Sequence, residues 1–161
     1  MSLVQSKFKT EDCIRWTLIG ALAGLIGGFT KSGVESVLPP RLPDAVPPPI
    51  GLLDMMGFDA NAMTYTYLEQ SVNWGGNGVH LVFSMVAGAV YCVLASRIKL
   101  ITLLNGIVFG LMIGLGAHCI ILPLMGLGLP PWKMGFEEYM SEIISSSIWI
   151  WTIDAIRRRF I

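Results

Sequence analysis

Apolar residues fall into four runs along the chain, at about residues 16–30, 79–96, 100–122 and 143–156. A helix needs about 20 residues to cross the hydrocarbon core of a bilayer. The second and third runs approach or exceed that length, whereas the first and last reach it only by extending into charged sequence. We therefore expect an all-α membrane domain over residues 1–161, a bundle of four transmembrane helices at about 16–35, 79–96, 100–122 and 137–156.

Residues 36–78 form the one long segment outside these expected spans. Its first part is rich in proline, including the run at 47–49, and should be extended and stiff. Asp59 is placed to cap a short surface helix over about residues 60–71. The second and third spans are joined only by residues 97–99, so they should form a tight antiparallel hairpin.

Composition and charge support a membrane location. Hydrophobic residues make up 53% of the chain and charged residues 14%, which is unlike a soluble domain. If both termini are cytoplasmic, eight of the 11 Lys and Arg residues lie inside, and Lys31, Arg41 and Lys133 lie outside. Basic residues favour the cytoplasmic side, so we expect a multi-pass membrane protein with both termini cytoplasmic. The chain has no basic stripe apart from this bias, so nucleic acid is not an expected partner.

Glycines recur every four residues on two of the expected helices. Small residues at this spacing let the backbone of a neighbouring helix approach closely in lipid. The stripes either pack helices within one chain or join subunits, and four short helices bury little surface, so we also expect a homo-oligomer. The expected packing positions are Gly20, Gly24 and Gly28 in the first helix, and Gly106, Gly110 and Gly114 in the third.

His118 occupies the next step of the second glycine stripe, inside an expected span. An ionisable residue in a span is costly and is a functional-site hypothesis by default. Helix lengths place several other ionisable groups at a similar depth toward the outer surface. Helix ends also collect charged residues, and Lys31 alone could extend its ammonium to the headgroups. The expected polar site consists of Lys31, Glu35, Arg41, His80, Ser84, His118 and Glu142.

Three functions fit these residues. The polar site could sense, bind or conduct protons or a small ion, because histidine titrates near pH 6.5 and carboxylates near pH 4. Alternatively, His80 and His118 could ligate a transition metal or haem in the bundle. The third alternative is a structural oligomer without a ligand site. The chain contains no nucleophile triad, phosphate loop or paired-cysteine motif, so we do not expect an enzyme.

Several short motifs, in order along nearly the whole chain, resemble the YagU family of bacterial inner-membrane proteins. The resemblance implies an inner-membrane location and a connection with acid resistance through a mechanism that it does not define. The matching motifs are residues 31–35 (Lys-Ser-Gly-Val-Glu), 38–43 (Leu-Pro-Pro-Arg-Leu-Pro), His80 with 83–84, 91–93, 98–100, His118, 123–127 (Pro-Leu-Met-Gly-Leu), 141–143, Trp149 with Trp151, and 157–158.

Overall fold

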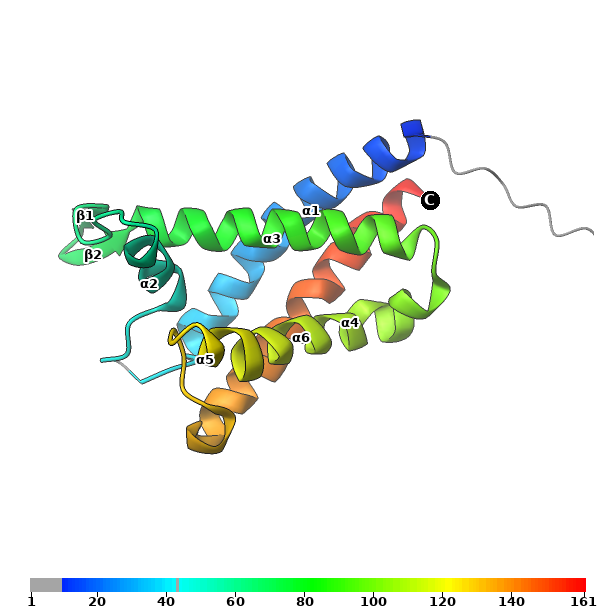
Figure 1. The fold of residues 1–161 in the computed structure, drawn as a ribbon. Helices are drawn as coiled ribbons and strands as arrows, with labels where there is room; N and C mark the ends of the chain where they lie inside the picture. The colour runs from blue at the N-terminus through cyan, green and yellow to red at the C-terminus, as the bar shows by residue number, and fades with distance from the viewer. Residues whose placement is uncertain (1–9, 43) are drawn as a thin grey trace, which may run out of the picture.

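The protein is mainly helical. The computed structural model describes residues 10–42 and 44–161; Lys7 and Lys9, two of the basic residues assigned to the cytoplasmic side, lie outside these ranges. The long helices are α1 (Thr10–Val37), α3 (Trp74–Ala95), α4 (Ile107–Gly116) and α6 (Phe136–Arg157), and α4 continues through a π-helical turn (Ala117–Ile121) into α5 (Leu122–Leu124). The start of α1 and the C-terminus meet at one end of the molecule, the terminal end (Figure 1). Residues 38–73 and 125–135 form the opposite, loop end.

Within the described residues, three helical stretches are long and apolar enough to cross a membrane: Thr10–Val37, Trp74–Ala95 and Lys99–Leu124. They cover the first three expected spans. In α1, Leu18, Leu22 and Ile26 recur every four residues and are all more than half exposed, as side chains that face lipid would be. The inward face of α1 carries small residues instead, since Gly20, Ala23 and Gly24 are buried.

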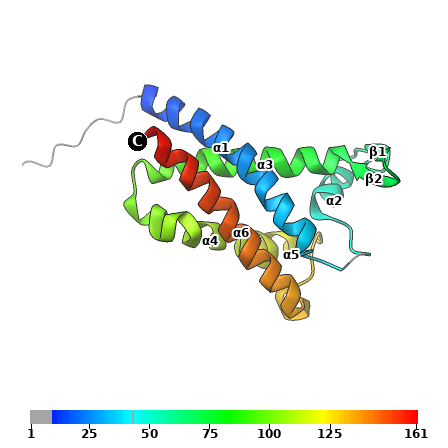
Figure 2. The ribbon, with the colours of Figure 1, turned by 180° about the vertical axis from the view of Figure 1, so that it is seen from behind.

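α6 covers the fourth expected span but is not among those three stretches. Its 22 residues give it a length of about 33 Å. Its polar side chains face inward, since Glu142, Ser146 and Asp154 are buried. α6 runs antiparallel to α1, side by side with it (Figure 2), and packs against α4 on another face. Its apolar residues Trp149 and Ile150 lie in the hydrophobic core.

The segment between α1 and α3 differs from the expectation. The stretch expected as a surface helix over 60–71 is a β-hairpin, in which β1 (Thr64–Tyr67) pairs antiparallel with β2 (Gln70–Asn73). Alternating threonine and tyrosine favour a strand over a helix. Asp59 does act as a cap, but of a turn: its carboxylate accepts the backbone N–H groups of Asn61 and Ala62.

The stretch expected to be extended around Pro47 also differs, because α2 (Pro48–Met55) begins there. Proline suits the first turn of a helix, because a backbone N–H there would have no partner within the helix. Leu53 of α2 is buried, and α2 packs on α3 near the loop end.

The third expected span is not one continuous helix from Leu100. Residues Lys99–Gly106 form tight turns interrupted by backbone in other conformations, with Leu103 extended and Leu104 and Asn105 left-handed. Gly106, with φ of 85°, therefore precedes α4 instead of belonging to it. Near the other end, Pro123 cannot donate a backbone hydrogen bond. The preceding turn widens, and the Leu122 N–H bonds the Ala117 carbonyl five residues back.

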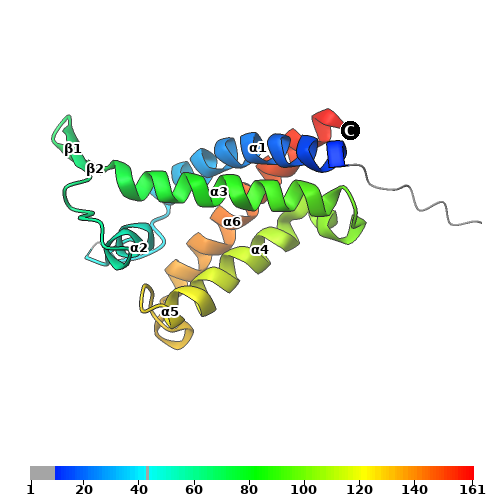
Figure 3. The same ribbon diagram turned by 45° about the horizontal axis from the view of Figure 1, so that its top comes forward.

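The glycine stripes lie at contacts between helices of the same chain. A Cβ atom on Gly24 would collide with the Ser84 carbonyl oxygen of α3, and a Cβ atom on Gly110 would lie 2.6 Å from the Ser146 carbonyl oxygen of α6. Gly20 meets Gly88, and Gly114 faces the Glu142 side chain. The outcome is a layered arrangement in which α1 packs between α3 and α6, while α3 and α4 diverge toward the loop end (Figure 3).

Candidate functional site

The Glu142 carboxylate is the centre of a buried polar cluster. Glu142 is 1% exposed. Its oxygens lie 3.1 and 3.2 Å from Lys31 Nζ, and Oε2 lies 3.2 Å from Nε2 of His118. The Ser146 hydroxyl donates a further hydrogen bond to Oε1. Lys31 also donates to Ser145 Oγ at 2.8 Å and pairs with Glu35 Oε1 at 3.0 Å. The cluster therefore joins three helices.

Each helix supplies its residue for a local reason. On α1, Lys31 and Glu35 are four residues apart and share a face, so they pair along the helix. On α6, Glu142 and Ser146 are related in the same way. Gly114 leaves the space that the Glu142 carboxylate occupies, since a Cβ there would lie 2.6 Å from Oε1. His118 follows one turn later, in the π-helical turn, and such turns often occur at functional sites.

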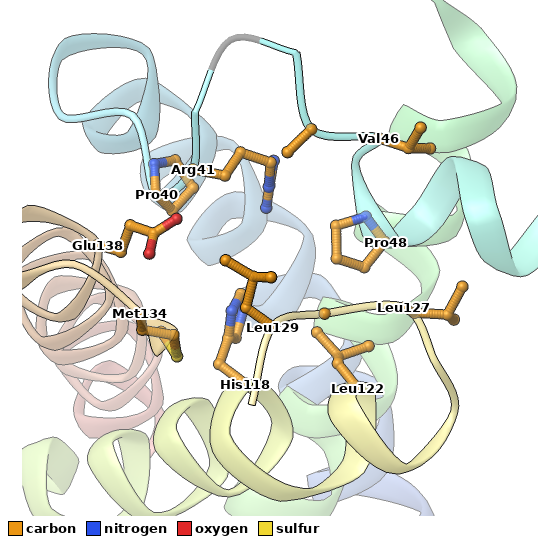
Figure 4. Close-up of a pocket in the computed structure, with 12 residues that line it drawn as sticks. Pro40, Arg41, Val46, Pro48, His118, Leu122, Leu127, Leu129, Met134 and Glu138 are labelled. Carbon is orange, nitrogen blue, oxygen red and sulfur yellow. The ribbon is translucent and has the colours of Figure 1, made fainter. Parts of the chain in front are cut away.

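Arg41 approaches this cluster from the loop end. Its guanidinium points toward His118 across a small cavity of about 70 Å³ (Figure 4). Burial lowers the pKa of Arg41 from its ordinary value, and the negative charges of Glu35, Glu142 and Glu138 act against that shift. Arg41 nevertheless stays positively charged, because a guanidinium is not deprotonated in proteins. With neutral histidines, the charges of Lys31 and Arg41 balance those of Glu35 and Glu142.

The cavity beside His118 is large enough for water. A single water needs about 10–15 Å³ of such volume, so 70 Å³ has room for a few molecules. Pro40, Glu138 and Leu129 from the loop end line it (Figure 4). The His118 side chain is 20% exposed, whereas Glu142 behind it is sealed. Of the two basic side chains that contact Glu142 directly, His118 is thus more exposed than Lys31, whose side chain is 8% exposed.

A second and larger cavity, the α3–α4 cleft, adjoins the first, and Arg41, His118 and Leu122 line both. It has a volume of about 1020 Å³ and is bounded by α1, α3 and α4, with residues 39–42 and 47–50 across the loop end. Lys31, Glu35, Arg41, His80 and His118 all line it. His80 is therefore brought to the same cleft as His118, but it does not contact Glu142. Its Nε2 atom is buried and has no hydrogen-bond partner among the described residues.

Ser84 lines the cleft, but its hydroxyl is used in helix packing. It donates to the Gly24 carbonyl oxygen of α1 at 2.6 Å and accepts from Trp149 Nε1 of α6 at 2.6 Å. One serine thereby joins three helices at their closest approach. Five of the six predicted ionisable residues line the polar end of the cleft, and the sixth, Glu142, is buried behind Lys31 and His118.

No group of three or more His, Cys, Asp and Glu side chains suited to a metal occurs in the described part of the chain. The expectation of a metal or haem bound by His80 and His118 thus gains no further ligands from the structure. Glu142, the nearest carboxylate to His118, is already bound by Lys31.

A second buried cluster, near the terminal end, is absent from the sequence-based prediction. Asp154 is 1% exposed; it accepts a hydrogen bond from Tyr91 at 2.8 Å and pairs with Arg157 and Arg158. Arg158 also donates to Asn105 in the break before α4. The spacing of Asp154 from Arg157 and Arg158, three and four residues along one helix, was the available signal. Tyr91 carries no such signal, because its partner is 63 residues away.

Comparison with known proteins identifies the family. Residues 25–155 match the family model described as a protein of unknown function (DUF1440). The chain is also 35% identical to the inner membrane protein YagU of Escherichia coli (strain K12), over 87% of this chain and 81% of the relative. No solved structure matches the chain. The matched region contains the whole buried cluster, from Lys31 to Glu142, and the chain belongs to the YagU (DUF1440) family.

Proposed function

We propose that this protein is a multi-pass inner-membrane protein that responds to acidification of the cell exterior through His118 and Glu142. The observation that carries the proposal is the contact of one buried carboxylate with both Lys31 and His118, at 3.1 and 3.2 Å. A link with acid resistance, implied by the family resemblance, agrees with such a site.

The location rests on three supports. The related Escherichia coli protein is named an inner membrane protein. Three helical stretches of this chain are apolar enough to span a bilayer. α6 serves as a fourth span in this proposal, because its polar face is covered by α1 and α4 and its length of about 33 Å exceeds the roughly 30 Å of a hydrocarbon core. Four spans place both termini on one side, and the excess of basic residues makes that side cytoplasmic.

The response follows from competition for Glu142. With His118 neutral, Lys31 is the only cation in direct contact with the Glu142 carboxylate among the described residues. Protonation of His118 adds a second cation at 3.2 Å and changes a balanced cluster into a positively charged one. Lys31 then has an alternative partner ready in Glu35, 3.0 Å away. We expect the Lys31–Glu142 contact between α1 and α6 to weaken as pH falls.

The test uses the fact that the chain has only two histidines. Protein labelled with ¹⁵N-histidine and reconstituted in nanodiscs gives two imidazole signals, which His80→Gln and His118→Gln assign. We expect the His118 ring to become protonated as the pH is lowered from 7 to 4. Over the same range, hydrogen exchange corrected for its intrinsic pH dependence should rise in residues 28–37. His118→Gln should abolish the pH dependence of exchange, whereas His80→Gln, the matched control, should retain it.

Two results would contradict the proposal. One is a His118 ring that stays neutral down to pH 4. The other is an unchanged exchange profile in His118→Gln, which would show that some other group drives the response.

A further inference from the structure

The α3–α4 cleft has one polar end and long apolar walls. Its walls come from α3, α4 and α5, and its apolar lining includes Phe83, Met112, Ile113, Ile120, Ile121 and Leu122. Several of these residues are open to the surroundings; Met112 is 69% exposed and Ile120 is 59% exposed. They lie within the stretches that are apolar enough to span a membrane. The cleft is therefore reached from the side, at the depth of the acyl chains.

Two polar groups at the closed end of the cleft lack hydrogen-bond partners within the described part of the chain. The Arg41 guanidinium makes no hydrogen bond or ion pair with any other described residue, although it carries five N–H donors. The buried Nε2 atom of His80 also lacks a partner within the described part of the chain. Lys31, by contrast, is fully engaged by Glu35, Glu142 and Ser145. A polar group buried without a hydrogen bond costs free energy, so a ligand that satisfies both groups would be stabilised.

The chemistry of that ligand follows from the two ends of the cleft. A guanidinium binds a phosphate through two parallel hydrogen bonds, and Nε2 of His80, when it carries a proton, can donate a third. A free anion would leave the apolar walls uncovered. Ligand pockets usually hold roughly 300–1,000 Å³, and the cleft, at about 1020 Å³, has room for a headgroup and part of an acyl chain.

A second copy of this chain suits the cleft less well. The exposed face of α1, the longest span, offers Leu18, Leu22 and Ile26, which would cover the walls but leave Arg41 unpaired. The glycine stripes, which would favour a close helix pair, are already occupied within the chain. We infer that the α3–α4 cleft binds a phospholipid with an anionic headgroup, its phosphate held by Arg41 and His80 and one acyl chain lying between α3 and α4.

This inference is independent of the proposed acid response, which depends on His118 and Glu142. The experiment is native mass spectrometry of detergent-solubilised protein titrated with dioleoyl phosphatidylglycerol. Dioleoyl phosphatidylcholine has the same chains without the net charge, and glycerol phosphate has the charge without the chains. We expect one phosphatidylglycerol per chain, bound about tenfold or more tightly than either comparison compound.

Two variants locate the site, each with a matched control. Arg41→Gln should remove the preference for phosphatidylglycerol, whereas Lys133→Gln, which removes an exposed positive charge at the same end, should keep it. Gly116 lines the cleft with nothing within 4 Å of its Cβ position, so Gly116→Leu should fill the cleft without a clash and block binding. Gly33 has equally open surroundings but does not line the cleft, and Gly33→Leu should bind normally.

Several outcomes would overturn the inference. Equal binding of the two lipids would show that the site does not select an anionic headgroup. An unchanged preference for phosphatidylglycerol in Arg41→Gln would show that the guanidinium does not bind the phosphate. Glycerol phosphate binding as tightly as the lipid would show a site for a free anion. Lipid binding that survives Gly116→Leu would place the lipid elsewhere, and a dimer that excludes lipid from the cleft would identify a second copy as the occupant.

Discussion

Lys31 shows how a charged residue is accommodated within a membrane-spanning helix. Its side chain is 8% exposed, and its ammonium is surrounded by oxygen atoms of Glu35, Glu142, Ser145 and Ser146. A carboxylate or ammonium removed from water is stable only when it is paired and hydrogen-bonded. Each of Lys31 and Glu142 therefore depends on the other to be stable as a buried charge.

Replacing one partner should therefore cost more than replacing both. Lys31→Met leaves Glu142 buried without its main cation, and breaking a buried pair in this way typically costs about 3–5 kcal/mol. We expect a clear fall in the melting temperature in detergent. The double variant Lys31→Met/Glu142→Gln removes both charges and should recover much of that stability. Lys133→Met, at an exposed position, is the control. A single variant as stable as the wild type would mean that the ion pair contributes nothing to the fold.

At the scale of helices, glycine determines which surfaces touch. α1 and α3 approach so closely at Gly20, Gly24 and Gly88 that backbone atoms of one helix occupy the Cβ positions of the other. The Ser84 hydroxyl bonds the Gly24 carbonyl at the same crossing. Van der Waals packing of this kind is the principal force between helices in lipid, where burial of apolar surface gives little.

A methyl group is enough to test this packing. In Gly24→Ala, the new Cβ would meet the Ser84 carbonyl oxygen and lie 2.8 Å from Met85 Cα, so the two backbones must separate. Overpacking of this kind usually costs about 1–3 kcal/mol. Gly33→Ala, in the same helix with open space around it, should be neutral or slightly stabilising, since alanine favours helix. Thermal unfolding of the two variants in detergent compares them; equal melting temperatures would exclude close packing at Gly24.

Local sequence patterns predicted some elements of the fold correctly and missed others. The approximate positions of α1 and α3 and the small faces of the helices follow from hydrophobic runs and four-residue spacing, which are local properties. The β-hairpin at 64–73 was wrongly predicted as a helix because helical spacing and strand alternation coexist there. The break at 103–105 was missed because Leu103 and Leu104 read as apolar helix. The contact of Tyr91 with Asp154 depends on packing between distant helices, which no local pattern encodes.

The whole molecule combines a hydrophobic core with buried polar clusters, and many large apolar side chains are exposed on its surface. Its two buried clusters lie toward opposite ends: Lys31 with Glu142 near the loop end, and Asp154 with Arg157 near the terminal end. The terminal end also carries most of the unburied basic residues, including Arg15 and Arg159. The direction in which the chain is inserted thus decides which compartment His118 samples through its small cavity.

Orientation can be measured with single cysteines. In a background from which Cys13, Cys92 and Cys119 have been removed, Met56→Cys places a thiol at an exposed loop-end position and Arg159→Cys places one at the terminal end. Because basic residues are retained on the cytoplasmic side, we expect a membrane-impermeant maleimide to label Met56→Cys in spheroplasts and to label Arg159→Cys only after the membrane is opened.

The reverse labelling pattern would have a definite consequence. The loop end, with Arg41, Glu138 and the cavity beside His118, would then face the cytoplasm. The cytoplasm is buffered near neutral pH, so His118 would have no acid compartment to report on and the proposed response to the exterior would fail. The lipid inference would survive, but its ligand would come from the inner leaflet. Orientation is therefore the measurement on which the two proposals diverge.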